Sequence, residues 1–194
     1  MQQVLSSVLA TFKSLHEQDK LWTSLHKNMS VSSKNLTVLL EHRDICKKVN
    51  LYQTALHKFP NIKDDLLYKI DLKIESEIND IESCLEELNK VKNEVTGVVS
   101  EALECHNKHA SNIKNTEFIN GTARVPPLSY MIEALQDISL FYTVHCQLYN
   151  AFSDERNIQL KINFKQLLSE DEKLRDKIHE IFAVTSLFVE EGIT

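Results

Sequence analysis

The sequence predicts an elongated all-α protein: an antiparallel helical bundle or coiled coil with two long N-terminal helices and a shorter C-terminal helical part. Only 3 Gly and 3 Pro occur in 194 residues, so few positions can form the tight turns that connect strands. Apolar residues instead recur at helical spacing through every long segment. A content of 42% hydrophobic and 26% charged residues is typical of a folded protein, and the length predicts one elongated domain over 1–194.

The first helix is predicted over about 2–49. Its apolar residues repeat every seven positions, along the line Val8, Leu15, Trp22, Met29 and Leu36. Poor helix formers gather at Ser30–Ser33, where the helix could kink. Trp22 is the only tryptophan; a core anchor is the stronger interpretation, and a contact for a partner protein is the alternative.

A second long helix is predicted over about 62–113. It follows Phe59-Pro60-Asn61, because proline disfavours a helix at the residue before it and asparagine favours a helix N-cap. Gly97 inside this helix indicates a kink or a close contact with another helix. At 1.5 Å per residue the helix would be roughly 80 Å long, well beyond the size of a compact domain.

The apolar stripe of the second helix is wider than a two-stranded seam, so it is expected to contact two or more neighbours. The stripe either packs against the chain's own first helix or binds another protein. Its middle part supplies four candidate partner-binding residues besides Trp22: Ile81, Leu85, Leu88 and Val95.

A loop over 114–127, with Asn-Gly and Pro-Pro pairs, precedes the C-terminal helices, which are predicted over about 128–191. The third helix has an apolar inner face: Ile132, Leu135, Ile138, Tyr142, Tyr149 and Phe152. A further helical segment is expected over 154–168. The last helix is predicted to start at a capping box of Ser169 and Glu172, and to bury Ile178, Ile181, Phe182, Thr185 and Phe188.

Charge is distributed unevenly along the chain, although the net charge is only −6. Residues 1–63 carry 9 basic and 4 acidic side chains, whereas residues 64–90 carry 3 and 9. Independently solvated faces are the stronger interpretation of this asymmetry; a basic first helix that lies against an acidic second one is the alternative. No segment is dense enough in Lys and Arg to indicate direct nucleic-acid binding.

No recognised catalytic motif is present, and the sequence predicts a protein that is not an enzyme and has no cofactor. Glycine is too scarce for a nucleotide-binding loop, and no HExxH motif occurs. Cys105, His106 and His109 lie within one helical turn and could contribute to a zinc site, but a fourth ligand is not evident. We expect no metal site here, and a metalloenzyme bundle is the remaining alternative.

The four cysteines lack metal or redox spacing, which predicts buried free thiols in a reducing compartment. The N-terminus resembles no signal peptide, and no apolar run is long enough to span a bilayer. The chain is therefore expected inside the cell.

Four sequence landmarks together resemble the AIRIM family of small helical ribosome-maturation factors. They are Glu17-Gln18 with Leu21-Trp22, Phe59-Pro60-Asn61-Ile62-Lys63, the segment Met131–Ile138 with Tyr142, and Phe188-Val189-Glu190-Glu191. The order and spacing of the landmarks match along nearly the whole chain. One segment departs from the family, since Thr143–Leu148 contains no Arg or Lys where the family is basic.

The resemblance implies a non-catalytic subunit that joins the helical protein CINP and type II AAA ATPases of the spermatogenesis-associated class. It implies a role in the cytoplasmic maturation of the pre-large ribosomal subunit, where the ATPase releases a shuttling assembly factor, and a role in the turnover of replication proteins on chromatin. Both cytoplasm and nucleus are then expected locations, with the pre-ribosomal particle as an indirect partner. The competing hypothesis is a coiled-coil tether in a cytoskeletal or kinetochore-type assembly.

Overall fold

A computed structural model describes residues 2–50, 55–59, 61–109, 120–122, 125–154 and 175–191 of the chain. The helices in these ranges are α1 (Gln2–Lys48), the short 3-10 helix η2 (Ala55–Lys58), α2 (Ile62–His109), α4 (Leu128–Asp154) and α6 (Asp176–Glu191). No strand occurs among the described residues, and none of their helices is long and apolar enough to cross a bilayer. The all-α prediction is confirmed.

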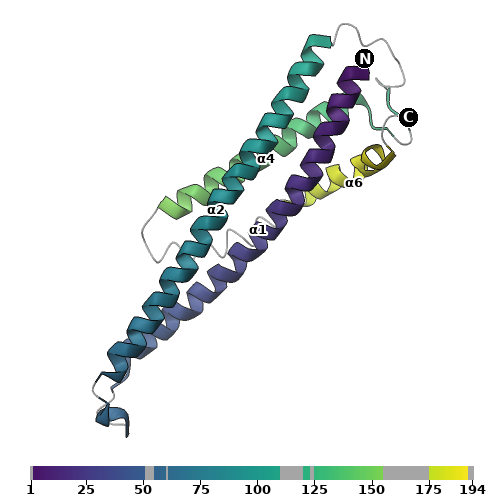
Figure 1. The fold of residues 1–194 in the computed structure, drawn as a ribbon. Coiled ribbons are helices and arrows are strands. Elements are labelled where there is room, and N and C mark those ends of the chain that lie inside the picture. Colours follow the sequence, from purple (N-terminus) through teal and green to yellow (C-terminus); the bar gives the residue numbers. More distant parts are fainter. Residues whose placement is uncertain are drawn as a thin grey trace.

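Helices α1 and α2 lie side by side as a long antiparallel pair that forms the axis of the molecule (Figure 1). They contain 47 and 48 residues, which corresponds to about 70 Å each. α1 continues through Ser30–Ser33, so the helix is not broken there. α2 continues through Gly97, where an added Cβ would meet no atom within 4 Å, so the predicted close helix contact at Gly97 is wrong.

One half of this helix pair, which we call the body, contains the hydrophobic core. Here α4 packs against α2, and α6 packs mainly against α1 (Figure 1). The heptad line of α1 is buried as predicted, with Val8, Leu15, Trp22 and Met29 fully buried. The other helices contribute Leu88, Val95 and Val99 from α2, Leu135, Ile138, Tyr142 and Tyr149 from α4, and Ile178, Ile181 and Phe188 from α6.

The contact between α4 and α2 includes a pair of side-chain amides. Asn89 and Asn150 each donate to the other's carbonyl oxygen at 3.1 Å. Close by, the thiol of Cys146 lies 3.4 Å from the carbonyl oxygen of Leu88. These polar contacts fix the position of α4 along α2, because side-chain amides pair only at one register.

We call the other half of the helix pair the arm. It comprises residues 30–50, which include the last turns of α1, the short helix η2, and residues 61–80, which include the first turns of α2. Only Ser33, Leu36 and Ile70 are buried in it. Neither α4 nor α6 extends along the arm, which projects from the body as two helices (Figure 1). The arm therefore depends mainly on contacts between its own two helices.

The C-terminal part differs from the prediction at the start of the last helix. Arg175 lies in a turn, and its carbonyl oxygen accepts the amide of His179 at 2.9 Å, so α6 begins at Asp176 rather than at Ser169. The capping box, most of the predicted helix over 154–168, and the end of the helix predicted to reach 113 lie outside the described residues. The side chain of Phe152 is outside them too.

The described part of the predicted loop contains one position that requires glycine. Gly121 has φ +74°, and a Cβ there would lie 2.8 Å from Cδ of Pro127. The amide of Thr122 donates to the carbonyl oxygen of Val125 at 2.8 Å and closes this turn ahead of α4. A left-handed backbone packed against a proline ring excludes any larger residue.

Candidate functional site

The described residues contain no group of three or more His, Cys, Asp and Glu side chains placed to hold a metal ion. The three residues weighed as zinc ligands are half-buried near the end of α2. Nδ1 of His109 lies 2.9 Å from the carbonyl oxygen of Cys105, one turn earlier, so this ring interacts with its own helix. All four cysteines are free thiols; Cys146 is buried, but Cys46, Cys84 and Cys105 are only half-buried, so the prediction of buried thiols is wrong for these three. The candidate site is therefore sought on the surface.

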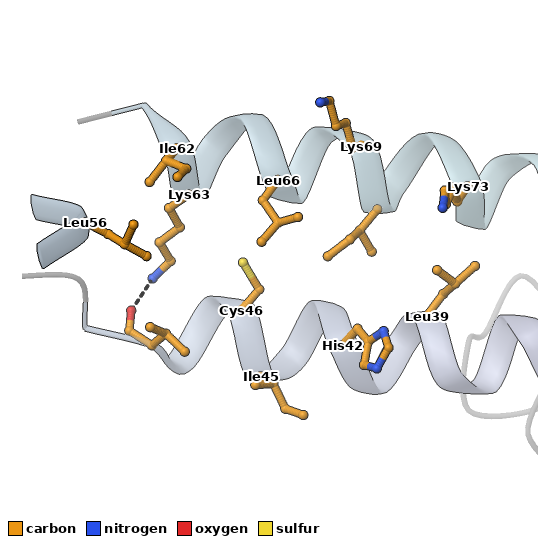
Figure 2. A pocket seen from close by; sticks show the side chains of 12 residues that line it. Leu39, His42, Ile45, Cys46, Leu56, Ile62, Lys63, Leu66, Lys69 and Lys73 are labelled. Atoms are coloured by element: carbon orange, nitrogen blue, oxygen red, sulfur yellow. Dashed lines mark hydrogen bonds between the residues drawn. The ribbon is translucent and has the colours of Figure 1, made fainter. Parts of the chain in front are cut away.

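A groove of about 600 Å³ lies at the end of the arm, where α1 ends and α2 begins; we call it the tip groove (Figure 2). Its apolar lining comes from α1, η2 and α2, chiefly Leu39, Ile45, Val49, Leu56, Ile62 and Leu66. Several of these side chains are exposed: Ile45 by 59%, Leu66 by 50% and Leu56 by 43%. An exposed apolar surface of this kind is typical of a protein-binding site.

Lys63 joins the two sides of the tip groove. Its Nζ donates to the carbonyl oxygen of Lys47 at 2.8 Å and to that of Val49 at 3.0 Å. The last carbonyls of a helix lack intrahelical partners and carry partial negative charge, so an ammonium group from α2 stabilises the C-terminal end of α1. This contact sets the spacing of the helices at the groove.

An ion pair fixes the helices farther along the arm. Nε of Arg43 lies 2.7 Å from Oδ1 of Asp71, and the amide of Asn35 donates to Glu77 at 3.1 Å. Both contacts join the two helices, and the Arg43–Asp71 pair places a basic residue of the first helix against an acidic residue of the second. Lysine is the charged residue type at the groove itself, since the described residues that line it include Lys63, Lys69 and Lys73 and no carboxylate.

The five predicted partner-binding residues lie in the body, away from the tip groove. Trp22 and Val95 are fully buried, Leu88 is 1% exposed and Leu85 is 5% exposed. Ile81 is half-buried and packs against the same core. The burial of these residues is what we expect of core positions. Their role in partner binding stays a prediction.

Trp22 is enclosed by aromatic residues of α4. Its ring lies edge-on to Tyr142 with centroids 4.7 Å apart, and stacks on Tyr149 at 6.1 Å. Both geometries are favourable for aromatic pairs and add to the burial of apolar area. Trp22 thus anchors α4 on α1.

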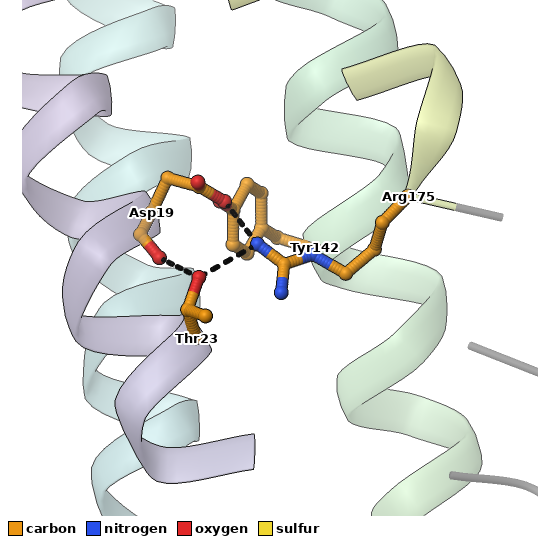
Figure 3. Close-up of polar contacts among 4 residues, drawn as sticks. All are labelled: Asp19, Thr23, Tyr142 and Arg175. Carbon is orange, nitrogen blue, oxygen red and sulfur yellow. Dashed lines mark hydrogen bonds and ion pairs between the residues drawn. The ribbon is translucent and has the colours of Figure 1, made fainter. Parts of the chain in front are cut away.

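A buried polar cluster next to Trp22 joins three helices (Figure 3). Nη2 of Arg175, at the start of α6, lies 2.6 Å from Oδ1 of Asp19 and donates to the hydroxyl of Thr23 at 2.9 Å. The hydroxyl of Tyr142 donates to the same Asp19 oxygen at 2.8 Å. Sequence reasoning missed this cluster, because its members come from separate segments and form no motif.

The chain is similar to a known family over nearly its whole length. Residues 2–190 match the family described as ribosome biogenesis protein C1orf109-like. The AFG2-interacting ribosome maturation factor of Homo sapiens is 25% identical over 187 residues, covering 93% of this chain and 92% of that protein. The protein of the same name from Xenopus tropicalis is 24% identical over 142 residues, covering 73% and 68%. The chain therefore belongs to the C1orf109-like family of ribosome biogenesis proteins.

Proposed function

We propose that this chain is a non-catalytic adaptor that joins an AFG2-type AAA ATPase to the maturing large ribosomal subunit. The observation that supports the proposal is the family match over residues 2–190, together with relatives that are named for ribosome maturation and for interaction with AFG2. A helical rod with exposed apolar surface suits such a role, because an adaptor contributes binding energy and raises the local concentration of one partner near another.

The finer parts of the proposal come from the sequence resemblance. The helical protein CINP is the proposed companion subunit, and the ATPases are of the spermatogenesis-associated class. ATP hydrolysis would release a shuttling assembly factor from the cytoplasmic particle. A second proposed role is the turnover of replication proteins on chromatin, which places the chain in both cytoplasm and nucleus.

Affinity purification of the tagged full-length chain, followed by mass spectrometry, tests the adaptor function. We expect the AFG2-type ATPase and CINP to be recovered, and purified ATPase to comigrate with the purified chain on size exclusion. Depletion of the chain should retain the shuttling factor on cytoplasmic pre-large subunits. Recovery of filament or kinetochore proteins without any ATPase would instead support the tether hypothesis.

A further inference from the structure

Among the described residues, no helix covers the tip groove in the way that α4 covers the same helix pair in the body. In the body, α4 lies on α2 and buries Ile138, Tyr142 and Tyr149 at the seam. On the arm, no helix of the described part of the chain takes this position. Leu66 and Ile45 are consequently half exposed at the mouth of an apolar groove, whereas Leu88 and Trp22 are buried.

The groove has the length and shape for one helix face. On α1 its lining extends from Leu39 to Val49, which is about 15 Å or three helical turns. A helix that lies in such a groove inserts apolar side chains spaced three and four residues apart. An occupant of this form would complete a three-helix arrangement on the arm, as α4 does in the body.

The charges at the groove define the flanks of its occupant. Lys69 and Lys73 lie one turn apart on the α2 side (Figure 2), both are exposed, and neither has an ion-pair partner in the described part of the chain. Lys63 adds a third ammonium group, although its hydrogen bonds are used by the end of α1. Because no carboxylate of the described residues lines the groove, a ligand with acidic side chains is electrostatically complementary to it.

A nucleic acid fits this surface poorly. Three lysines are few for a phosphate backbone, and among the described residues no Phe, Tyr or Trp lines the groove for base stacking. The apolar floor of the groove would then face a charged nucleic acid and gain no apolar contact. An amphipathic protein helix can place apolar side chains on the floor and acidic side chains next to the lysines.

We propose that the tip groove binds an amphipathic helix of a protein partner, with an apolar stripe on the floor and acidic residues facing Lys69 and Lys73. This inference rests on the proposed adaptor function, since it supplies the chemistry of one partner that the adaptor holds. The binding surface is then separate from the buried core residues of the body.

The test uses two synthetic helical peptides of about 18 residues. Both carry the same leucine stripe, and the flanking positions are Glu in one and Lys in the other. Fluorescence anisotropy with the full-length chain should show the Glu peptide binding about tenfold more tightly than the Lys peptide, with a difference that shrinks as salt is added.

Groove variants and matched controls locate the binding. Leu66→Asp should weaken binding of the Glu peptide about tenfold, while Leu140→Asp, which is on α4 and 62% exposed, should leave it unchanged. The double variant Lys69→Glu with Lys73→Glu should reverse the peptide preference. Lys13→Glu with Lys20→Glu, exposed on α1 in the body, makes the same charge change away from the groove. Circular dichroism verifies that every variant is folded.

The inference would be overturned by equal binding of the two peptides, by absence of binding to the wild-type chain, or by binding that Leu66→Asp does not affect. A concentration-dependent dimer that Leu66→Asp abolishes would show that a second copy occupies the groove, and would also overturn it. The proposed function fails separately. If the ATPase is recovered by the wild type but the Glu peptide does not bind the groove, only the groove inference is wrong; if the Glu peptide binds the groove but no ATPase is recovered, only the adaptor function is wrong.

Discussion

Arg175 and Asp19 form the buried ion pair that attaches the start of α6 to α1. Their side chains are 6% and 15% exposed, and Thr23 and Tyr142 supply further hydrogen bonds. A buried pair adds little to stability compared with an apolar replacement of both residues. Removal of one member, however, leaves the other charge buried without compensation.

Replacement of Arg175 by methionine should therefore lower the free energy of unfolding by about 3 kcal/mol, because Asp19 stays buried and loses its cation. Urea unfolding followed by circular dichroism measures the loss. Lys177→Met is the matched control two residues later, since Lys177 pairs with Asp137 at 2.9 Å but is 68% exposed. The control should unfold nearly as the wild type does. An equal loss in both variants would contradict the role of the buried pair.

His16 predicts a pH dependence of stability. Burial lowers the pKa of this imidazole from 6.5, with Asp19 opposing the shift, and the ring packs 4.5 Å from that of Phe182. As the pH falls through 6.5, the unfolded chain takes up a proton before the folded chain does. The contribution of His16 to stability is thus complete above pH 6.5 and is lost as the pH falls toward the lower pKa of the folded state.

The variant His16→Gln should remove this part of the pH dependence. Urea midpoints at about pH 7.5 and about pH 5 should differ less in the variant than in the wild type. His42→Gln, at an exposed position on the arm, controls for the loss of an imidazole. If both variants retain the wild-type difference between the two pH values, His16 is not its source.

At the scale of the helices, the apolar line of α1 shows which features a sequence pattern can predict. Val8, Leu15, Trp22, Met29 and Leu36 were expected on one face, and the structure buries them all to 2% exposure or less. A seven-residue repeat reports a helix face directly, because seven residues are nearly two turns. The bounds of α1 and the start of α2 followed from the same pattern and from the proline between them.

Other features depend on contacts that no local pattern contains. Asp19 and Arg175 are 156 residues apart, and each is an ordinary surface residue type until the fold brings them together. The apolar line of α1 has the same spacing in the body and toward the arm, so it could not show where α4 stops covering the helix pair. The tip groove was missed for that reason, although exposed Ile45 and Leu66 are visible as apolar residues in the sequence.

The middle of α2 belongs to the core, so charged substitutions there should destabilise the fold. Leu85→Asp with Leu88→Asp would bury two unpaired carboxylates, each at a cost of several kcal/mol, and should abolish the folded helical state. Leu66→Asp with Leu72→Asp is the matched change on the same helix, at positions that are 50% and 47% exposed. Circular dichroism should show helicity lost in the first variant and retained in the second. A folded first variant would contradict the assignment of Leu85 and Leu88 to the core.

The whole molecule is a rod with its core at one end. Helices of about 70 Å exceed the dimensions of a compact chain of this length, for which the expected radius of gyration is about 16 Å. Small-angle X-ray scattering of the monomer should therefore give a clearly larger radius and a distance distribution with a long tail. A symmetric distribution with a radius near the compact value would contradict the extended arm.

The length of the arm sets the distance between the body and the tip groove. From Met29, the last fully buried residue of α1 in the body, to Cys46 at the tip groove, the helix rises about 25 Å. Removal of one heptad from each arm helix would shorten this span by about 10 Å while nearly preserving the orientation of both faces. The distance between the body and the tip groove is therefore determined by helix length, and it can change in heptad steps without alteration of the body or of the groove.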